Sequence, residues 1–309
     1  MVARGSSTTS SRTSPSSSTS DVGPAARALG YVRLVHPFPS LLDGLATGAI
    51  VIVAGGDGLT ALRLAASMFS IQASIGALND VCDAPADAGG KMRKPVPAGL
   101  VGPRAATAIA ALAAVVGLGL ALPSGPAVTL VAIAGASIGY AYDLALGRTT
   151  WSWLAWAAGL PLLPVFAWLG GAGRLPPAFV LLVPAAVLAG TGLSLANALA
   201  DLERDLAAGV GTVATRLGRA RAWSVGALLQ AVVLAVALLT VAALGDVQGT
   251  AARLGVVAGA VVVGCGLVLG ARDDPIRREM GWEVQAVGIA VAGAAWLACL
   301  DAAGLLRGT

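Results

Sequence analysis

Two clusters of carboxylate and amide side chains are the parts of this sequence best suited to chemistry. Both follow the pattern Asn-x-x-x-Asp-x-x-x-Asp, and the corresponding positions keep one constant offset along the chain. The first cluster contains Asn79, Asp80, Asp83 and Asp87, and the second contains Asn197, Asp201 and Asp205. Residues four apart lie on the same side of an α-helix, so each pattern predicts a polar stripe along one helix face.

Carboxylates that face one another repel, and this repulsion raises their pKa values unless a cation lies between them. Magnesium suits such a place because it takes one or two carboxylates, keeps several waters and completes its shell with phosphate oxygens. Two facing acidic clusters therefore predict a magnesium–diphosphate clamp. Mn²⁺ is a possible substitute. The residue between the second pair of aspartates, Glu203, is predicted to point away from the stripe.

The elements that must position these clusters are membrane helices. Hydrophobic residues make up 57% of the chain and charged residues 12%, whereas a soluble domain carries about 25% charged residues. The apolar residues form nine blocks, each close to the ~20 residues that cross a bilayer as a helix. The blocks are 38–54, 59–79, 104–122, 126–146, 152–170, 178–200, 222–244, 251–270 and 284–304. We therefore expect an all-α membrane protein with nine transmembrane helices in one bundle.

The repeated cluster predicts an internal duplication of a four-helix unit, because four helices separate the two copies. Most of the 20 Lys and Arg residues lie in loops that are cytoplasmic if the N-terminus is inside. Both acidic clusters are then cytoplasmic and the C-terminus is external. The net charge of +4 reflects this topology, and no motif indicates a nucleic-acid partner or an obligate protein partner. Residues 1–27 are Ser-rich and predict a disordered tail before a membrane domain at 28–309.

The acidic clusters and the segments after them resemble the UbiA superfamily of intramembrane prenyltransferases. The first cluster is followed by the basic, proline-containing run from Lys91 to Pro97, and the second by Gly209, Thr212 and Arg216. The resemblance covers about residue 30 to the C-terminus. It implies transfer of a prenyl group from a prenyl diphosphate to a small lipophilic acceptor, with an aromatic ring as the favoured class, within the lipid membrane.

The resemblance also implies roles for individual residues. The implied magnesium ligands are Asn79, Asp80, Asp83, Asp87, Asp201 and Asp205. The implied catalytic residues are Asp83, Asp201 and Tyr142. The residues expected to bind substrate are Asn79, Lys91, Lys94, Arg148, Asn197 and Asp43. Of these, Lys91 and Lys94 also serve as cytoplasmic topology signals, and Asp43 in the first helix is equally consistent with a hydrogen-bonded structural role.

One departure from the family pattern follows the fourth helix. The family usually has a Tyr, a short spacer and Leu-Lys there, and this chain has Gly147 in place of the Lys. The next residue, Arg148, can supply the positive charge from a different direction.

Three other functions remain open. One is phosphoribosyl transfer to polyprenyl phosphate on the same fold. Another is a cation or metabolite transporter, although transporter sites lie near the bilayer midplane and not at helix ends. The third is a weakly active homologue, which the missing lysine at Gly147 suggests.

Overall fold

The computed structural model describes residues 23–87, 94–245 and 249–306, and every regular element in these ranges is a helix. Eight helical segments are long and apolar enough to cross a membrane, or up to nine if α1 (Pro24–Leu34) and α2 (Pro37–Val53), which meet at 46°, form one span. The all-helical membrane fold expected from the sequence is confirmed. The count of nine and the four-helix repeat stay predictions.

The candidate spans follow the predicted apolar blocks in order. After α1 and α2, they are formed by α3 (Gly58–Asp87), α4 (Pro103–Ala121), α5 (Pro126–Ala141), α6 (Ser152–Gly159) together with α7 (Leu162–Ala172), α8 (Phe179–Ala200), α11 (Arg219–Ala243), α12 (Thr250–Gly270) and α13 (Pro275–Ala302). Two short helices that the sequence did not indicate, α9 (Leu202–Ala207) and α10 (Val213–Leu217), follow α8. The first helix, α1, begins within the predicted tail, and the remainder of that tail lies outside the described residues.

Proline residues mark several helix starts. α2, α4, α5 and α13 each begin with a proline, where the fixed φ suits the first turn and the missing N–H costs nothing. Pro161 lies between α6 and α7 and divides the predicted fifth span into two helices. Pro85, in contrast, lies inside α3, which continues to Asp87. The acidic stripe of α3 is therefore carried on one helix.

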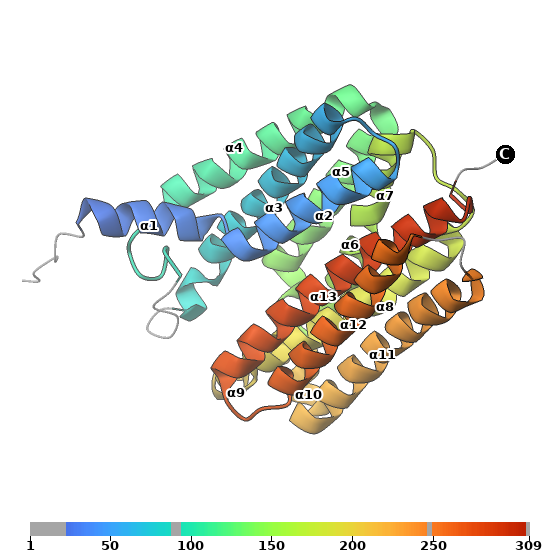
Figure 1. Ribbon diagram of the computed structural model, residues 1–309. Coiled ribbons are helices and arrows are strands. Elements are labelled where there is room, and N and C mark those ends of the chain that lie inside the picture. Colours follow the sequence, from blue (N-terminus) through green and yellow to red (C-terminus); the bar gives the residue numbers. More distant parts are fainter. Residues whose placement is uncertain (1–22, 88–93, 246–248, 307–309) are drawn as a thin grey trace, which may run out of the picture.

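Small residues let the C-terminal helices pack closely. A Cβ added to Gly259 of α12 would lie 2.6 Å from the backbone nitrogen of Ala292, and one added to Gly266 would lie 2.7 Å from that of Gln285. Membrane helices associate through such close backbone approaches because lipid gives them little hydrophobic driving force. α12 and α13 therefore form a tightly packed pair. α12 ends and α13 begins at the end of the bundle where the second acidic cluster lies (Figure 1).

Figure 1 shows α2–α5 grouped on one side of the bundle and α8 and α11–α13 on the other. α2 packs against α13, and α6 packs against both α5 and α8, so the two groups are joined. The short helices α9 and α10 lie at one end of the bundle, and α13 ends at the opposite end (Figure 1). The two acidic clusters thus come from different groups of helices.

Candidate functional site

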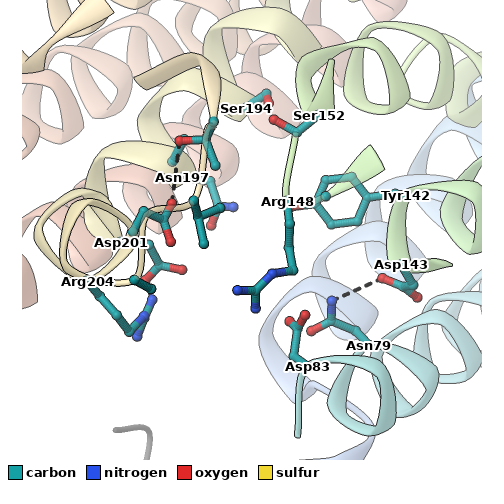
Figure 2. A pocket seen from close by; sticks show the side chains of 16 residues that line it. Asn79, Asp83, Tyr142, Asp143, Arg148, Ser152, Ser194, Asn197, Asp201 and Arg204 are labelled. Carbon is teal, nitrogen blue, oxygen red and sulfur yellow. Dashed lines mark hydrogen bonds and ion pairs between the residues drawn. The ribbon is translucent and has the colours of Figure 1, made fainter. Parts of the chain in front are cut away.

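A polar cavity lies where the end of α3, the turn after α5, and the junction of α8 with α9 meet. It encloses about 800 Å³, including its open mouth. Its polar lining consists of Asn79, Asp83, Tyr142, Asp143, Arg148, Ser152, Ser194, Asn197, Asp201, Arg204, Asp205 and Thr212. Side chains from both acidic clusters therefore face the same space, as their common pattern predicted (Figure 2).

The first cluster presents Asn79 and Asp83, one helical turn apart on α3. The Lys94 ammonium donates hydrogen bonds to Asn79 Oδ1 at 3.1 Å and to Asp83 Oδ2 at 3.0 Å. These two oxygens thus converge on one positively charged atom. The amide and carboxylate oxygens are the hard ligands that Mg²⁺ prefers. The lysine ammonium occupies the position between them that would suit a metal cation.

Asp80 is placed differently from its neighbours. Its side chain is fully buried, it does not line the cavity, and its Oδ2 accepts the backbone N–H of Val96 at 2.9 Å. Lys94 Nζ lies 4.0 Å from its Oδ1. Asp80 therefore attaches the segment that contains Lys94 and Val96 to α3. This position does not favour its expected role as a metal ligand.

Two further residues that the sequence predicts for the site, Asp87 and Lys91, lie at or beyond the edge of the described residues. The backbone of Asp87 ends α3, but its side chain lies outside the described part of the chain, and Lys91 lies outside the described residues altogether. Their expected roles stay predictions.

The second cluster spans the junction of two helices. α8 ends at Ala200, and Asp201 is both the last cap of α8 and the first cap of α9. The prediction that one continuous helix carries this cluster is therefore wrong. However, the backbone N–H of Asp205 donates a hydrogen bond to the carbonyl of Asp201 at 2.9 Å. This bond preserves the four-residue spacing across the break. Asn197, Asp201 and Asp205 all line the cavity.

Arg204 and Glu203 of α9 have different partners. Arg204 pairs with Asp201 and lines the cavity, although the sequence had not marked it as a site residue. Glu203 points away, as predicted, and pairs with Arg278 at the start of α13. The Arg278 side chain is 0% exposed, so α9 is tied to a buried cation on its far side.

The third wall of the cavity is the π-helical turn Tyr142–Leu146 (η2), where the Gly147 N–H donates to the Tyr142 carbonyl at 2.8 Å. A Cβ at Gly147 would lie 3.1 Å from that carbonyl oxygen and 3.2 Å from Cε1 of the Tyr142 ring. A side chain at 147 would therefore crowd Tyr142, which gives a physical reason for the missing lysine. Arg148 extends from this turn into the space between the two acidic groups (Figure 2).

Asp143, in the same turn, is a wall residue that the sequence reasoning missed. Its Oδ1 accepts a hydrogen bond from Asn79 Nδ2 at 3.0 Å (Figure 2). The available signal was its location, because a carboxylate at the predicted cytoplasmic end of the fourth helix lies on the same membrane face as both acidic clusters.

Asp43 lies deeper in the bundle and does not line the cavity. Its Oδ2 accepts a hydrogen bond from Gln72 Nε2 at 2.5 Å, which joins α2 to α3. Gln72 precedes Asn79 by seven residues on nearly the same face of α3, or about 10 Å along the helix. Asp43 and the first acidic cluster therefore border the same face of α3 at different depths.

Aromatic rings lie between the helix groups near this depth. Trp282 of α13 meets Phe38 of α2 edge-to-face at 5.6 Å and Trp156 of α6 at 6.2 Å between ring centroids. Trp156 also hydrogen-bonds the Tyr142 side chain. Trp156 therefore belongs to the interior wall next to the cavity.

The donor set fits a magnesium site that is completed by substrate. Among the described residues, no three His, Cys, Asp or Glu side chains come together closely enough to hold a metal ion alone. Magnesium does not require such a cage, because it binds one or two carboxylates and leaves room for waters and phosphate oxygens. Asn79 and Asp83, facing Asp201 and Asp205 across the cavity, match that incomplete shell.

Comparison with known proteins gives the family. The model of the UbiA prenyltransferase family matches residues 44–283, so the chain belongs to this family and is an integral, multi-pass membrane protein. No curated protein matches the chain.

Solved structures share the fold. A UbiA homologue from Archaeoglobus fulgidus bound to GPP and Mg²⁺ superimposes with a TM-score of 0.66 at 18% identity, covering 86% of this chain and 99% of that one. A UbiA homologue from Aeropyrum pernix K1 gives 0.68 at 17% identity, covering 83% and 96%. A digeranylgeranylglyceryl phosphate synthase structure gives 0.64 at 15% identity, covering 89% and 99%.

Proposed function

We propose that this chain is a magnesium-dependent prenyltransferase that moves a prenyl group from a prenyl diphosphate to a small acceptor within the membrane. The observation that carries this proposal is the convergence of two acidic motifs, from α3 and from α8–α9, on one cavity with Arg148 between them. The homologues from Archaeoglobus fulgidus bound to GPP and Mg²⁺ and to DMAPP and Mg²⁺ support it.

In this proposal Asn79, Asp83, Asp201 and Asp205 hold the metal, and Mn²⁺ can replace Mg²⁺. Asp87 stays in the set on its sequence pattern. The bound metal supplies charge that stabilises the departing diphosphate. Lysine and arginine side chains at the cavity, namely Lys94, Arg148 and Arg204, add further positive charge around its oxygens, and Arg can grip phosphate with two hydrogen bonds. Lys91 stays in this set on its sequence pattern alone. The amide of Asn197 contributes a neutral contact from the wall of α8.

The apolar interior accepts the prenyl chain. Tyr142 lies at the boundary between the charged cavity and the aromatic wall formed by Trp156 and Trp282. The face of an aromatic ring stabilises a nearby cation, so Tyr142 is the residue placed to stabilise an allylic cation as the C–O bond breaks. Exclusion of water by the surrounding helices protects that cation from hydrolysis.

Asp43 is the proposed contact for the acceptor. It is held by Gln72, which lies about 10 Å deeper than Asn79 along α3, on the side away from the cytoplasmic mouth. A carboxylate there favours an acceptor that presents a hydroxyl or amine group, because a donor group satisfies it and a second carboxylate is repelled.

The positive-inside pattern supports an orientation in which the cavity opens to the cytoplasm. The N-terminus and both acidic motifs are then cytoplasmic and the C-terminus is external. A diphosphate reaches the cavity from water, while its prenyl chain enters between the helices. A transporter explains this arrangement less well, because the carboxylates lie at one end of the bundle and not near the midplane.

The test is transfer by membranes that contain the chain. Labelled prenyl diphosphates of increasing length are incubated with a panel of aromatic and lipid acceptors, with Mg²⁺ or with excess EDTA. We expect product only with metal, and none from Asp83→Asn or Asp201→Asn. Asp273→Asn is the control, because Asp273 is an exposed aspartate in the turn before α13. Transfer that persists in EDTA contradicts the proposal, as does full activity in either cavity variant.

A further inference from the structure

Asp143 is an acidic residue of the cavity that belongs to neither acidic motif. It lies in the π-helical turn after α5, directly after Tyr142. Turns of this type are uncommon and occur frequently at functional sites. Its Oδ1 accepts the hydrogen bond from Asn79 Nδ2, whereas its Oδ2 is buried and has no hydrogen-bond partner among the described residues. A buried carboxylate oxygen without a partner costs stability, so the turn keeps Asp143 at an energetic cost.

The hydrogen bond fixes which end of the Asn79 side chain faces the cation. An amide has an NH₂ group that only donates and a carbonyl oxygen that only accepts. The Asp143 oxygen holds the NH₂ group, and the Asn79 carbonyl oxygen is consequently turned towards Lys94 Nζ, 3.1 Å away. If the amide rotated by half a turn, its NH₂ group would face the cation and its oxygen would face a carboxylate. Both contacts would then be repulsive.

We propose that Asp143 is a positioning residue that holds the Asn79 amide with its oxygen towards the metal–diphosphate site. This inference rests on the proposed function of the cavity. It assigns Asp143 a role through Asn79 and not direct contact with metal or substrate. The rival role is direct metal ligation by the carboxylate. The two roles differ in what they require, because positioning needs an acceptor oxygen at this place, whereas ligation needs the negative charge.

Two substitutions separate these requirements. Asp143→Asn keeps an acceptor oxygen and removes the charge, and Asp143→Leu keeps the approximate size and removes both. Binding of Mn²⁺ in the presence of inorganic diphosphate, followed by electron paramagnetic resonance on the full chain in detergent, measures the site without requiring turnover. We expect Mn²⁺ affinity within about threefold of the parent for Asp143→Asn and about tenfold weaker for Asp143→Leu, the size of one lost hydrogen bond.

A double substitution tests more directly whether Asp143 acts through Asn79. In an Asn79→Ala background, Asp143→Leu should weaken Mn²⁺ binding no further, because a positioning residue has nothing left to position. Asp273→Asn is the control for general effects of losing an aspartate. If Asp143→Leu does not fold, as judged by thermal unfolding, Asp143→Ala replaces it in both arms.

Equal losses in Asp143→Asn and Asp143→Leu would overturn the proposal in favour of direct ligation, and so would additive losses in the Asn79→Ala background. Unchanged Mn²⁺ binding in Asp143→Leu would overturn it outright. The outcome is distinguishable from failure of the proposed function. A chain that binds Mn²⁺ and diphosphate but transfers no prenyl group refutes the activity and still tests the role of Asp143.

Discussion

The ion pair between Glu203 and Arg278 gives a prediction about stability that the spacing of the motif does not give. From spacing alone, Glu203→Gln is expected to be tolerated, because Glu203 points away from the metal stripe. The structure shows where it points instead. Glu203 pairs with Arg278, whose side chain is 0% exposed and whose Nε and Nη1 have no hydrogen-bond partner among the described residues. Glu203 is thus the carboxylate that neutralises a buried guanidinium.

The expected loss follows from the burial of the two partners. Removing one partner of a fully buried pair costs about 3–5 kcal/mol, because the other charge is left uncompensated, while an exposed pair contributes about 0–1 kcal/mol. Here the arginine is enclosed and the Glu203 side chain is 54% exposed. We therefore expect Glu203→Gln to lower the free energy of unfolding by about 2 kcal/mol.

The relative stabilities of three variants test whether the uncompensated charge of Arg278 causes the loss. Arg278→Met removes the buried charge and leaves Glu203 at the surface, so it should destabilise less than Glu203→Gln. Adding Arg278→Met to Glu203→Gln should recover part of the loss. The measurement is unfolding by SDS titration in mixed micelles. Asp273→Asn is the matched control, because Asp273 pairs with Arg219 but is 94% exposed. A Glu203→Gln value equal to that control would refute the reasoning, as would a double variant that is less stable than Glu203→Gln alone.

Two further predictions concern the cation at the cavity and the membrane topology. Arg148→Ala should lower kcat/KM for the prenyl donor roughly ten- to a hundred-fold, about 1.5–3 kcal/mol for one charge-assisted contact. Arg104→Ala, at an exposed arginine of α4 outside the cavity lining, is the control, and equal small effects would exclude Arg148 as a ligand. A reporter inserted at Asp273 should be cytoplasmic and one at the C-terminus external. The same side for both would mean that α13 does not cross the membrane.

The sequence was sufficient for those features that depend on local pattern. Long apolar blocks predict membrane helices because backbone groups in lipid must pair within the helix. A four-residue spacing predicts a common face because of helical geometry. Asp83 and Asp201, which share this spacing, line one cavity, and Glu203 is not part of its lining. The spacing also holds across the break after α8, because the Asp205 N–H still bonds the Asp201 carbonyl.

Sequence pattern could not separate residues that lie within one arc of a helix. Asn79, Asp80 and Asp83 fall within about 100° of each other, yet Asp80 turns to the backbone of Val96 while the other two face the cavity. That choice depends on where the segment after α3 packs. The partners of Glu203 and of Asp143 were likewise hidden, because Arg278 and Asn79 are far from them in the chain and only the folded bundle joins them.

The departure at Gly147 is best understood from the crowding around Tyr142. A lysine there would bring its Cβ within 3.2 Å of the Tyr142 ring, a distance that forces the ring to shift. Glycine leaves the Tyr142 ring at the cavity, hydrogen-bonded to Trp156, and the neighbouring Arg148 extends into the space between the two acidic groups (Figure 2). Since the guanidinium is longer and carries more donors than an ammonium, the cavity keeps its positive charge without a side chain at position 147. The altered motif therefore changes the direction from which the positive charge arrives, and the Arg148→Ala variant tests whether that charge acts on the prenyl donor.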